Sequence, residues 1–125
     1  MKELTKAEEQ VMQYVWKLKK CFLKDIVNEY PDPKPAYTTV STVVRVLIKK
    51  GFLGFKAYGK TNEYYAKLSK SSYTRNRVTG LLSNYFNGSV TSFVSYFTKD
   101  KKLSTEELQE MRNIIDKKIK ELEDD

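Results

Sequence analysis

Short hydroxyl side chains and cations recur at helical spacing between residues 37 and 53, and no acid interrupts them: Thr38, Ser41, Thr42, Arg45 and Lys49. The opposite face of such a helix is apolar, with aliphatic residues at i, i+3, i+4, i+7 and i+8: Val40, Val43, Val44, Leu47 and Ile48. A solvated helix normally mixes acids with bases, so an acid-free polar face is typical of a surface that meets an anion. Short hydroxyls let a helix lie deep in the major groove of DNA, and cations reach guanine edges or phosphates. We therefore predict a recognition helix in this segment.

The charge of the chain is concentrated in its first part. The formal net charge is +7. Residues 1–70 carry 14 Lys and Arg against 7 Asp and Glu, whereas residues 71–125 carry 9 of each kind. This asymmetry is expected if one half meets a polyphosphate and the other does not. On charge alone, a basic domain that binds no nucleic acid remains an open alternative.

Composition argues against several other classes of protein. Cys21 is the only cysteine and there is no histidine, so we expect no intrachain disulfide, no common zinc site and no histidine-based catalysis. Without a Gly-rich phosphate loop or a nucleophile beside a base, we expect neither an enzyme nor a small-molecule cofactor. Cys21 is interpreted as a buried small apolar residue at the end of the first helix, in preference to a reactive thiol. With no signal-like or membrane-length apolar run, the expected location is cytoplasmic.

Two further helices are predicted before the recognition helix. The capping box Thr5-Lys6-Ala7-Glu8 opens the first helix, over about residues 5–19. A shorter helix follows over residues 22–30, and the prolines of Pro31-Asp32-Pro33-Lys34-Pro35 end it. Gly51 is expected to end the recognition helix in a left-handed conformation.

After Gly51 the pattern changes to that of a β-hairpin. Residues 52–57 and 62–68 are rich in aromatic and aliphatic side chains, and Tyr58-Gly59-Lys60-Thr61 between them is a turn signal. Three helices followed by a hairpin predict a mainly α winged helix-turn-helix. Four residues are expected at the tip of the wing, close to a neighbouring phosphate: Lys56, Tyr58, Lys60 and Thr61. The alternative, a basic turn that is merely solvated, stays open.

Residues 71–125 are predicted to be a helical arm that follows a winged-helix domain of residues 1–70. Helical periodicity starts near Ser71 or Ser72, resumes after Asn87-Gly88, and resumes again after a capping box at Ser104. The apolar positions of the last two helices are Phe93, Val94, Phe97, Leu108, Met111, Ile115, Ile119 and Leu122. Such helices bury little alone, so we expect them to pack against a second copy in a two-fold homodimer. The alternative is that they pack back on the winged domain.

The order of these motifs resembles the penicillinase repressor family (BlaI/MecI type) from Leu4 to about Lys118. The similar motifs of the first half are Leu4-Thr5-Lys6-Ala7-Glu8, Val11-Met12, Val15-Trp16, Thr39-x-x-Thr42, Lys49-Lys50-Gly51-Phe52-Leu53 and Tyr64-Tyr65. Those of the second half are Phe93-Val94-Ser95-Tyr96-Phe97 and Leu103-Ser104-x-x-Glu107-Leu108-x-x-Met111-Arg112-Asn113-Ile114-Ile115.

The resemblance implies a dimeric repressor that binds a palindromic operator in double-stranded DNA. Family members control resistance genes, and cleavage within the arm releases them after a membrane-bound sensor peptidase detects a β-lactam. Carried onto this chain, the DNA contacts are Thr38, Thr39, Ser41, Thr42 and Arg45, with Lys49 and the wing on the DNA backbone. Tyr37, at the start of the same segment, is predicted as a further DNA contact. The cut falls between Tyr96 and Phe97.

Two differences separate this chain from the family pattern. Arg45 precedes Val46-Leu47, where family members often have Arg-Leu, and one residue turns a helical side chain by about 100°. The familiar scissile bond is Asn-Phe, where this chain has Tyr96-Phe97. The cysteine cluster of the copper-responsive branch is absent, so metal sensing is not expected.

A rival interpretation is a winged helix that binds protein instead of DNA. The salt dependence of binding to DNA distinguishes the two.

Overall fold

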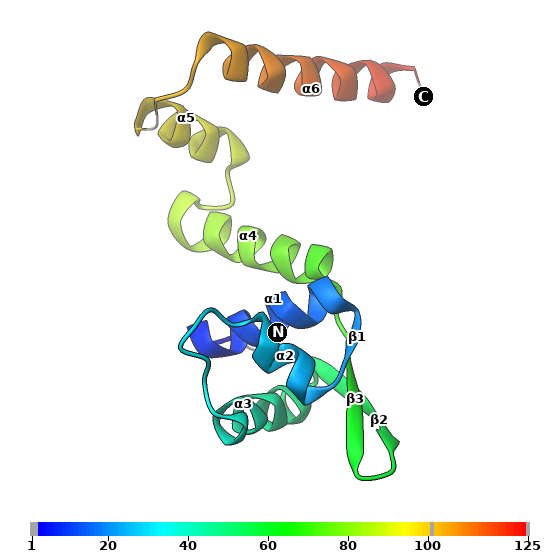
Figure 1. Ribbon diagram of the computed structural model, residues 1–125. Helices are drawn as coiled ribbons and strands as arrows, with labels where there is room; N and C mark the ends of the chain where they lie inside the picture. Colours follow the sequence, from blue (N-terminus) through cyan, green and yellow to red (C-terminus); the bar gives the residue numbers. More distant parts are fainter. Residues whose placement is uncertain (1–2, 101, 125) are drawn as a thin grey trace. The chain divides into compact units, whose positions relative to one another are not determined.

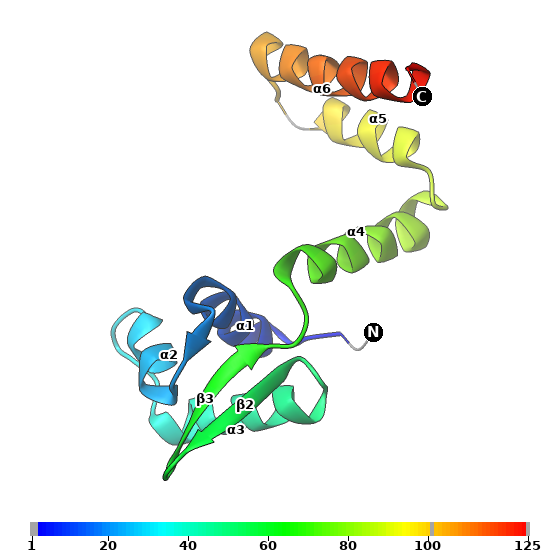
Figure 2. The same cartoon turned by 90° about the vertical axis from the view of Figure 1, so that its right-hand side faces the viewer.

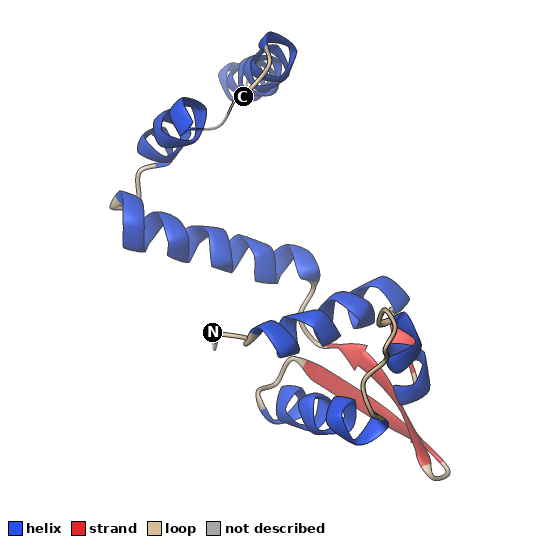
Figure 3. Ribbon diagram, turned by 60° about the vertical axis from the view of Figure 1, so that its left-hand side comes forward, coloured by secondary structure: helices blue, strands red, loops and turns tan. Residues whose placement is uncertain are grey.

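The computed structural model describes residues 3–100 and 102–124, which divide into two compact units at Val78 and Thr79. The winged unit contains α1 (Lys6–Leu18), β1 (Lys20–Cys21), α2 (Leu23–Glu29), α3 (Tyr37–Lys49), β2 (Leu53–Tyr58) and β3 (Thr61–Ala66). Helix α4 (Lys70–Phe86) runs across the division, and the second unit continues with α5 (Val90–Asp100) and α6 (Thr105–Glu123). These elements are labelled in Figure 1, and Figure 3 separates the helices from the strands. The predicted mainly α fold with a small wing is confirmed.

Local signals position the helices of the winged unit. Thr5 Oγ1 accepts a bond from the Glu8 amide at 3.2 Å, and Glu8 Oε1 accepts one from the Thr5 amide at 3.0 Å, which completes the predicted capping box. At the end of α3, Gly51 has φ 87° and the Phe52 amide donates to the Leu47 carbonyl at 3.0 Å. This left-handed residue lets the chain leave α3 and enter β2 directly.

The sheet has three antiparallel strands in the order β1-β3-β2 (Figure 2). Strands β2 and β3 form the predicted hairpin, and Gly59, with φ 60°, occupies a left-handed position in its two-residue turn. The short strand β1 was not predicted. It pairs Cys21 with Tyr64, so Cys21 lies in this strand and not at the end of the first helix as expected.

Cys21 is nevertheless buried, as predicted. Burial raises the pKa of its thiol to about 11, and the nearby carboxylates of Asp25 and Glu63 add to the shift. A thiol with so high a pKa stays protonated at neutral pH and is a weak nucleophile.

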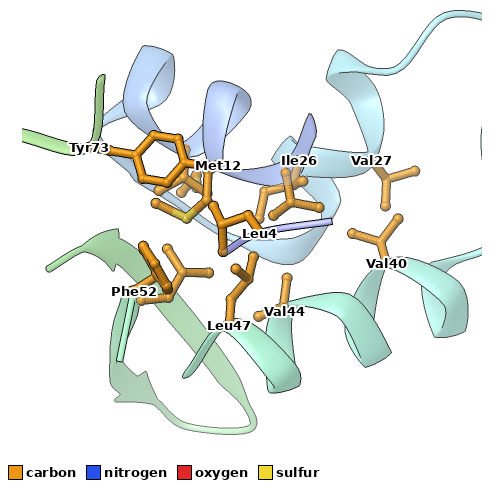
Figure 4. Close-up of a cluster of buried hydrophobic side chains, with 13 residues drawn as sticks. Leu4, Met12, Ile26, Val27, Val40, Val44, Leu47, Phe52 and Tyr73 are labelled. Carbon is orange, nitrogen blue, oxygen red and sulfur yellow. The ribbon is translucent and has the colours of Figure 1, made fainter. Parts of the chain in front are cut away.

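One apolar core lies between the helices and the sheet of the winged unit (Figure 4). The α3 stripe enters it through Val40, Val44 and Leu47, which are almost fully buried. Helix α1 adds Val11, Met12 and Val15, and α2 adds Ile26 and Val27. The core therefore holds α3 by one face and leaves its polar face outside.

The start of α4 also belongs to this core. Helix α4 begins at Lys70, slightly earlier than predicted, and the Ser69 hydroxyl accepts a bond from the Ser72 amide at 3.0 Å. Tyr73 is only 5% exposed, and its ring packs against the rings of Trp16 and Phe52. Its hydroxyl donates to Glu9 Oε2 at 3.2 Å, so the first turn of α4 is joined to α1.

Aromatic rings join α4 to α5 within the second unit. Phe86 lies 5.5 Å from Phe93 and 5.6 Å from Tyr96, between ring centroids. Helix α6 starts at the predicted capping box of Ser104 and Glu107, and it contains no buried residue.

Over the part of the chain that the structure covers, no helix has the length and apolarity needed to cross a membrane.

Candidate nucleic-acid interface

The outer face of α3 presents the residues predicted to contact DNA. Thr38, Thr39, Thr42, Arg45 and Lys49 are exposed, Ser41 is half-buried, and Tyr37 is 51% exposed at the first position of the helix. No acid lies among residues 37–49, so the face is polar and cationic. The structure therefore separates the two faces of α3 as the spacing predicts.

No side chain caps the N-terminal end of α3. Its N-cap residue is Ala36, which has no side chain to accept a bond from the first turn. The Ala36 carbonyl accepts from the amides of Thr39 and Val40, and the first turn contains no acid. An uncapped N-terminus with a partial positive charge favours a phosphate or another anion in front of it.

A hydrogen bond within α3 decides what Thr42 can offer to a base. Its hydroxyl donates to the Thr38 carbonyl at 2.9 Å. Because the hydroxyl has a single proton, Thr42 presents outward an acceptor oxygen and a methyl group. Those groups suit an exocyclic amino group or a thymine methyl in the major groove.

A surface hollow of about 430 Å³ lies between α2 and the polar face of α3. It is lined by Leu23, Tyr37, Thr38, Ser41, Thr42 and Arg45. All of these except Leu23 are predicted DNA contacts, so the structure brings most of the predicted α3 set to one concave patch. Lys49 lies at the other end of α3 and is not part of this hollow.

The predicted wing contacts lie at the far end of the β2–β3 hairpin, and all are exposed. The Lys56 ammonium sits 5.3 Å from the centroid of the Tyr58 ring. The Thr61 hydroxyl donates to the Tyr58 carbonyl at 3.0 Å and braces the turn that carries Lys60. This hydrogen bond therefore fixes the backbone of the turn that carries Lys60.

A second hollow, of about 500 Å³, joins the wing tip to the starts of α2 and α3. Tyr37, Lys60 and Thr61 line it, so three predicted contacts from two elements meet there. Its other lining residues were not predicted as site residues from the sequence: Phe22, Leu23, Lys24, Asn62 and Tyr64. Of these residues, only Lys24 could have been predicted from the sequence as a DNA contact. It is an exposed cation in the first turn of α2, and helix two of a winged helix-turn-helix crosses the DNA backbone.

The predicted dimer residues lie on α5 and α6. Leu108, Ile115, Ile119 and Leu122 are exposed and Met111 is half-buried, along one side of α6. On α5, Phe93 and Val94 are half-buried, and the rings of Phe93 and Phe97 stack at 5.8 Å. The Tyr96–Phe97 peptide bond lies inside α5, and Tyr96 is 59% exposed.

Among the residues covered by the structure, no three metal-binding side chains of the His, Cys, Asp or Glu type gather in one place.

A polar, acid-free face on the third helix, a hairpin beside it and a shared apolar core define a winged helix-turn-helix protein. The family model described as Penicillinase repressor matches residues 4–117, and the chain belongs to that family. The predicted resemblance is thereby confirmed.

Named relatives match over almost the whole chain. The methicillin resistance regulatory protein MecI of Staphylococcus aureus (strain N315) is 30% identical over 117 residues, 93% of this chain and 95% of the relative. The penicillinase repressor of Bacillus licheniformis is 27% identical over 115 residues, 91% of this chain and 90% of the relative. The solution structure of the DNA binding domain of the repressor BlaI aligns with a TM-score of 0.50 at 27% identity, over 58% of this chain and 94% of that domain.

Proposed function

We propose that this chain is a dimeric transcriptional repressor that binds an inverted-repeat operator of β-lactam resistance genes. In this proposal residues 1–70 bind DNA and residues 71–125 form the dimerisation arm. The relatives named as regulators of methicillin resistance and of penicillinase support the class of gene. The predicted homodimer and the sensor peptidase are part of the same proposal.

The acid-free face of α3 is the observation that carries the proposal. It combines an uncapped positive helix end, short hydroxyls and an exposed Arg45 with a cationic wing tip. A helix in the major groove needs short side chains to approach the bases and cations to hold the backbone. A winged helix that binds protein would gain nothing from excluding acids over 13 consecutive residues.

Titration of palindromic DNA with the intact chain tests this proposal. Fluorescence anisotropy should show a dimer bound to two half-sites about one helical turn apart. If each subunit neutralises three to five phosphates, log K should fall against log salt with a slope of about −5 to −9. A scrambled duplex of the same length is the matched control. A slope near zero, or equal affinity for both duplexes, would leave the protein-binding alternative.

The exposed apolar stripe of α6 supports dimerisation. A 19-residue helix that buries no residue within its own unit leaves its stripe in water unless another surface covers it. A second copy offers an identical stripe, and two identical surfaces related by a two-fold axis can cover each other. In the proposal, Phe93, Val94 and Phe97 extend this interface along α5.

Proteolysis between Tyr96 and Phe97 is the proposed means of release. The cut removes the whole of α6 from the winged unit and so separates the two half-site contacts. Because the bond lies within a helix, a peptidase needs local unfolding of α5 to reach it. Mass spectrometry of the chain after exposure to the sensor peptidase tests the position, and a product ending anywhere but Tyr96 contradicts it.

A further inference from the structure

The hollow between the wing tip and the starts of α2 and α3 has the size of a small-molecule site. Its volume is about 500 Å³, and small-ligand pockets usually lie between about 300 and 1,000 Å³. Three separate elements form its walls, namely the first turn of α2, the first residue of α3 and the outer part of the hairpin. Figure 2 shows the hairpin beside these two helices in the winged unit.

The lining combines aromatic rings with cations. Phe22, Tyr37 and Tyr64 supply the rings, while Lys24 and Lys60 supply the positive charge. No acid lines the hollow, and neither lysine forms an ion pair with any residue that the structure describes. Rings accept a flat apolar group, and ammonium groups attract an anion.

The walls are held in place before any ligand arrives. Asp25 Oδ2 accepts a bond from the Phe22 amide at 2.8 Å and fixes the start of α2. The Phe22 and Tyr58 rings meet edge to face at 6.2 Å, which joins this corner to the hairpin. A preformed site loses less conformational freedom on binding than one that must order its walls.

A phosphodiester strand alone does not account for this lining. DNA crossing between α3 and the wing would use Tyr37 and the two lysines, and Tyr64 also packs against the core. The sugars and phosphates of DNA have no need of the Phe22 ring at the start of α2. We propose that the hollow binds a small aromatic anion, a single ring that bears a carboxylate or a phosphate.

The bound anion would occupy Tyr37, Lys60 and Thr61, which are also proposed DNA contacts. This competition rests on the proposed function. By linkage, a ligand that excludes DNA weakens DNA binding by the same factor by which DNA weakens the ligand. The hollow would thus make the repressor responsive to a small metabolite as well as to cleavage.

Titration of the intact chain with phenyl phosphate, followed by amide chemical shifts in NMR, tests the site without DNA. Saturable shifts should concentrate on residues 22–24, 37 and 60–64. Inorganic phosphate, which lacks the ring, and benzyl alcohol, which lacks the charge, should each bind at least about tenfold more weakly. If inorganic phosphate binds as tightly as phenyl phosphate, or no ligand saturates, the proposal is wrong.

Two lysine variants locate the charge. Lys24→Ala should weaken phenyl phosphate by about fivefold to tenfold, since an ammonium contact to the anion is lost. Lys67→Ala removes the same charge one residue beyond the opposite end of β3 and should leave binding unchanged. Phe22→Leu tests the ring, and it should weaken phenyl phosphate more than inorganic phosphate. Equal losses in the two lysine variants would overturn the site in favour of general charge attraction.

The competition needs a separate measurement with DNA. Phenyl phosphate should lower the affinity of the chain for its duplex, and inorganic phosphate at equal ionic strength should not. If phenyl phosphate fills the hollow while DNA affinity stays constant, the competition is wrong. If the chain binds no DNA at all, the proposed function fails, and the NMR titration still decides the site.

Discussion

Lys50 Nζ lies 2.6 Å from Glu8 Oε1, and this ion pair joins the residue after α3 to the first turn of α1. The same carboxylate oxygen accepts the Thr5 amide of the capping box. Glu8 is 8% exposed, so its charge is stabilised by named partners and scarcely by water. One side chain therefore starts α1 and holds the C-terminal end of α3.

Lys50→Met should destabilise the winged unit by about 1 to 3 kcal/mol, because it leaves a buried carboxylate without its cation. Lys49→Met removes the neighbouring exposed charge and should change stability by less than about 0.5 kcal/mol. Urea unfolding followed by Trp16 fluorescence measures both, since this is the only tryptophan and it lies on α1. Equal stability of the two variants would show that the ion pair contributes nothing.

Acid should weaken the winged unit through the same residue. Burial acts to raise the pKa of Glu8, but the Lys50 ammonium and the Thr5 amide outweigh it and hold the pKa below its ordinary value of 4.5. As pH falls, the unfolded chain therefore takes up the proton first. The contribution of this carboxylate is complete above the ordinary value and is lost as pH falls through the lower folded value.

The isosteric variant Glu8→Gln isolates this effect. Gln still closes the capping box but cannot titrate. The difference in unfolding free energy between the intact chain and the variant should be largest above about pH 5 and should shrink below about pH 4. A difference that is constant across this range would contradict the link between Glu8 and acid stability.

Tyr73 should stabilise the winged unit mainly by its ring. Tyr73→Ala empties a position between Trp16 and Phe52 and should cost about 3 to 5 kcal/mol. Tyr73→Phe keeps the ring, loses only the bond to Glu9, and should cost about 0.5 to 1.5 kcal/mol. Urea unfolding of the two full-length variants, followed by Trp16 fluorescence, compares their stabilities. If Tyr73→Ala is as stable as Tyr73→Phe, the start of α4 is not part of the core.

Arg45 and Lys60 should affect DNA binding differently. Arg45→Ala should cost about 1 to 3 kcal/mol per half-site and relax base preference, because its side chain reaches base edges in the proposed complex. Lys60→Ala should weaken all sequences alike and reduce the salt slope by about one per subunit. Affinities for an operator series with single base changes separate the two. Unchanged base preference in Arg45→Ala would mean that α3 docks in another orientation.

Charge on the α6 stripe should split the proposed dimer. Ile115→Asp buries an unpaired carboxylate in that interface at a cost of several kcal/mol, and Phe97→Asp should act alike on α5. Asn113→Asp adds the same charge about 200° away around α6 and should leave the dimer intact.

Sedimentation gives the oligomeric state, and operator titration gives the affinity. The Ile115→Asp chain should be monomeric, with a folded winged unit and weak, mostly electrostatic DNA binding, because the second half-site contact is no longer intramolecular. A fragment of residues 1–96 should behave in the same way. A fragment that stays dimeric would place dimerisation outside residues 97–125.

The amino-acid sequence alone predicted those elements whose signals are local. The two faces of α3, the capping boxes at Thr5 and Ser104, and the stop at Gly51 depend on neighbours within a few residues, so periodicity and residue type suffice. The family followed from the order of these motifs along the chain. The predicted contacts on α3 and the wing could be named for the same reason, because each lies on an amphipathic helix or in a turn.

Only the tertiary structure decided what joins distant segments. Strand β1 has two residues and no pattern of its own, and it exists because Lys20 and Cys21 meet β3 more than 40 positions later. The Glu8–Lys50 pair spans 42 positions, and the Trp16 indole donates to the Leu68 carbonyl at 2.9 Å across 52 positions. The aromatic hollow likewise needs α2, α3 and the hairpin together. Such contacts depend on how the core brings the elements together, and no local periodicity encodes that arrangement.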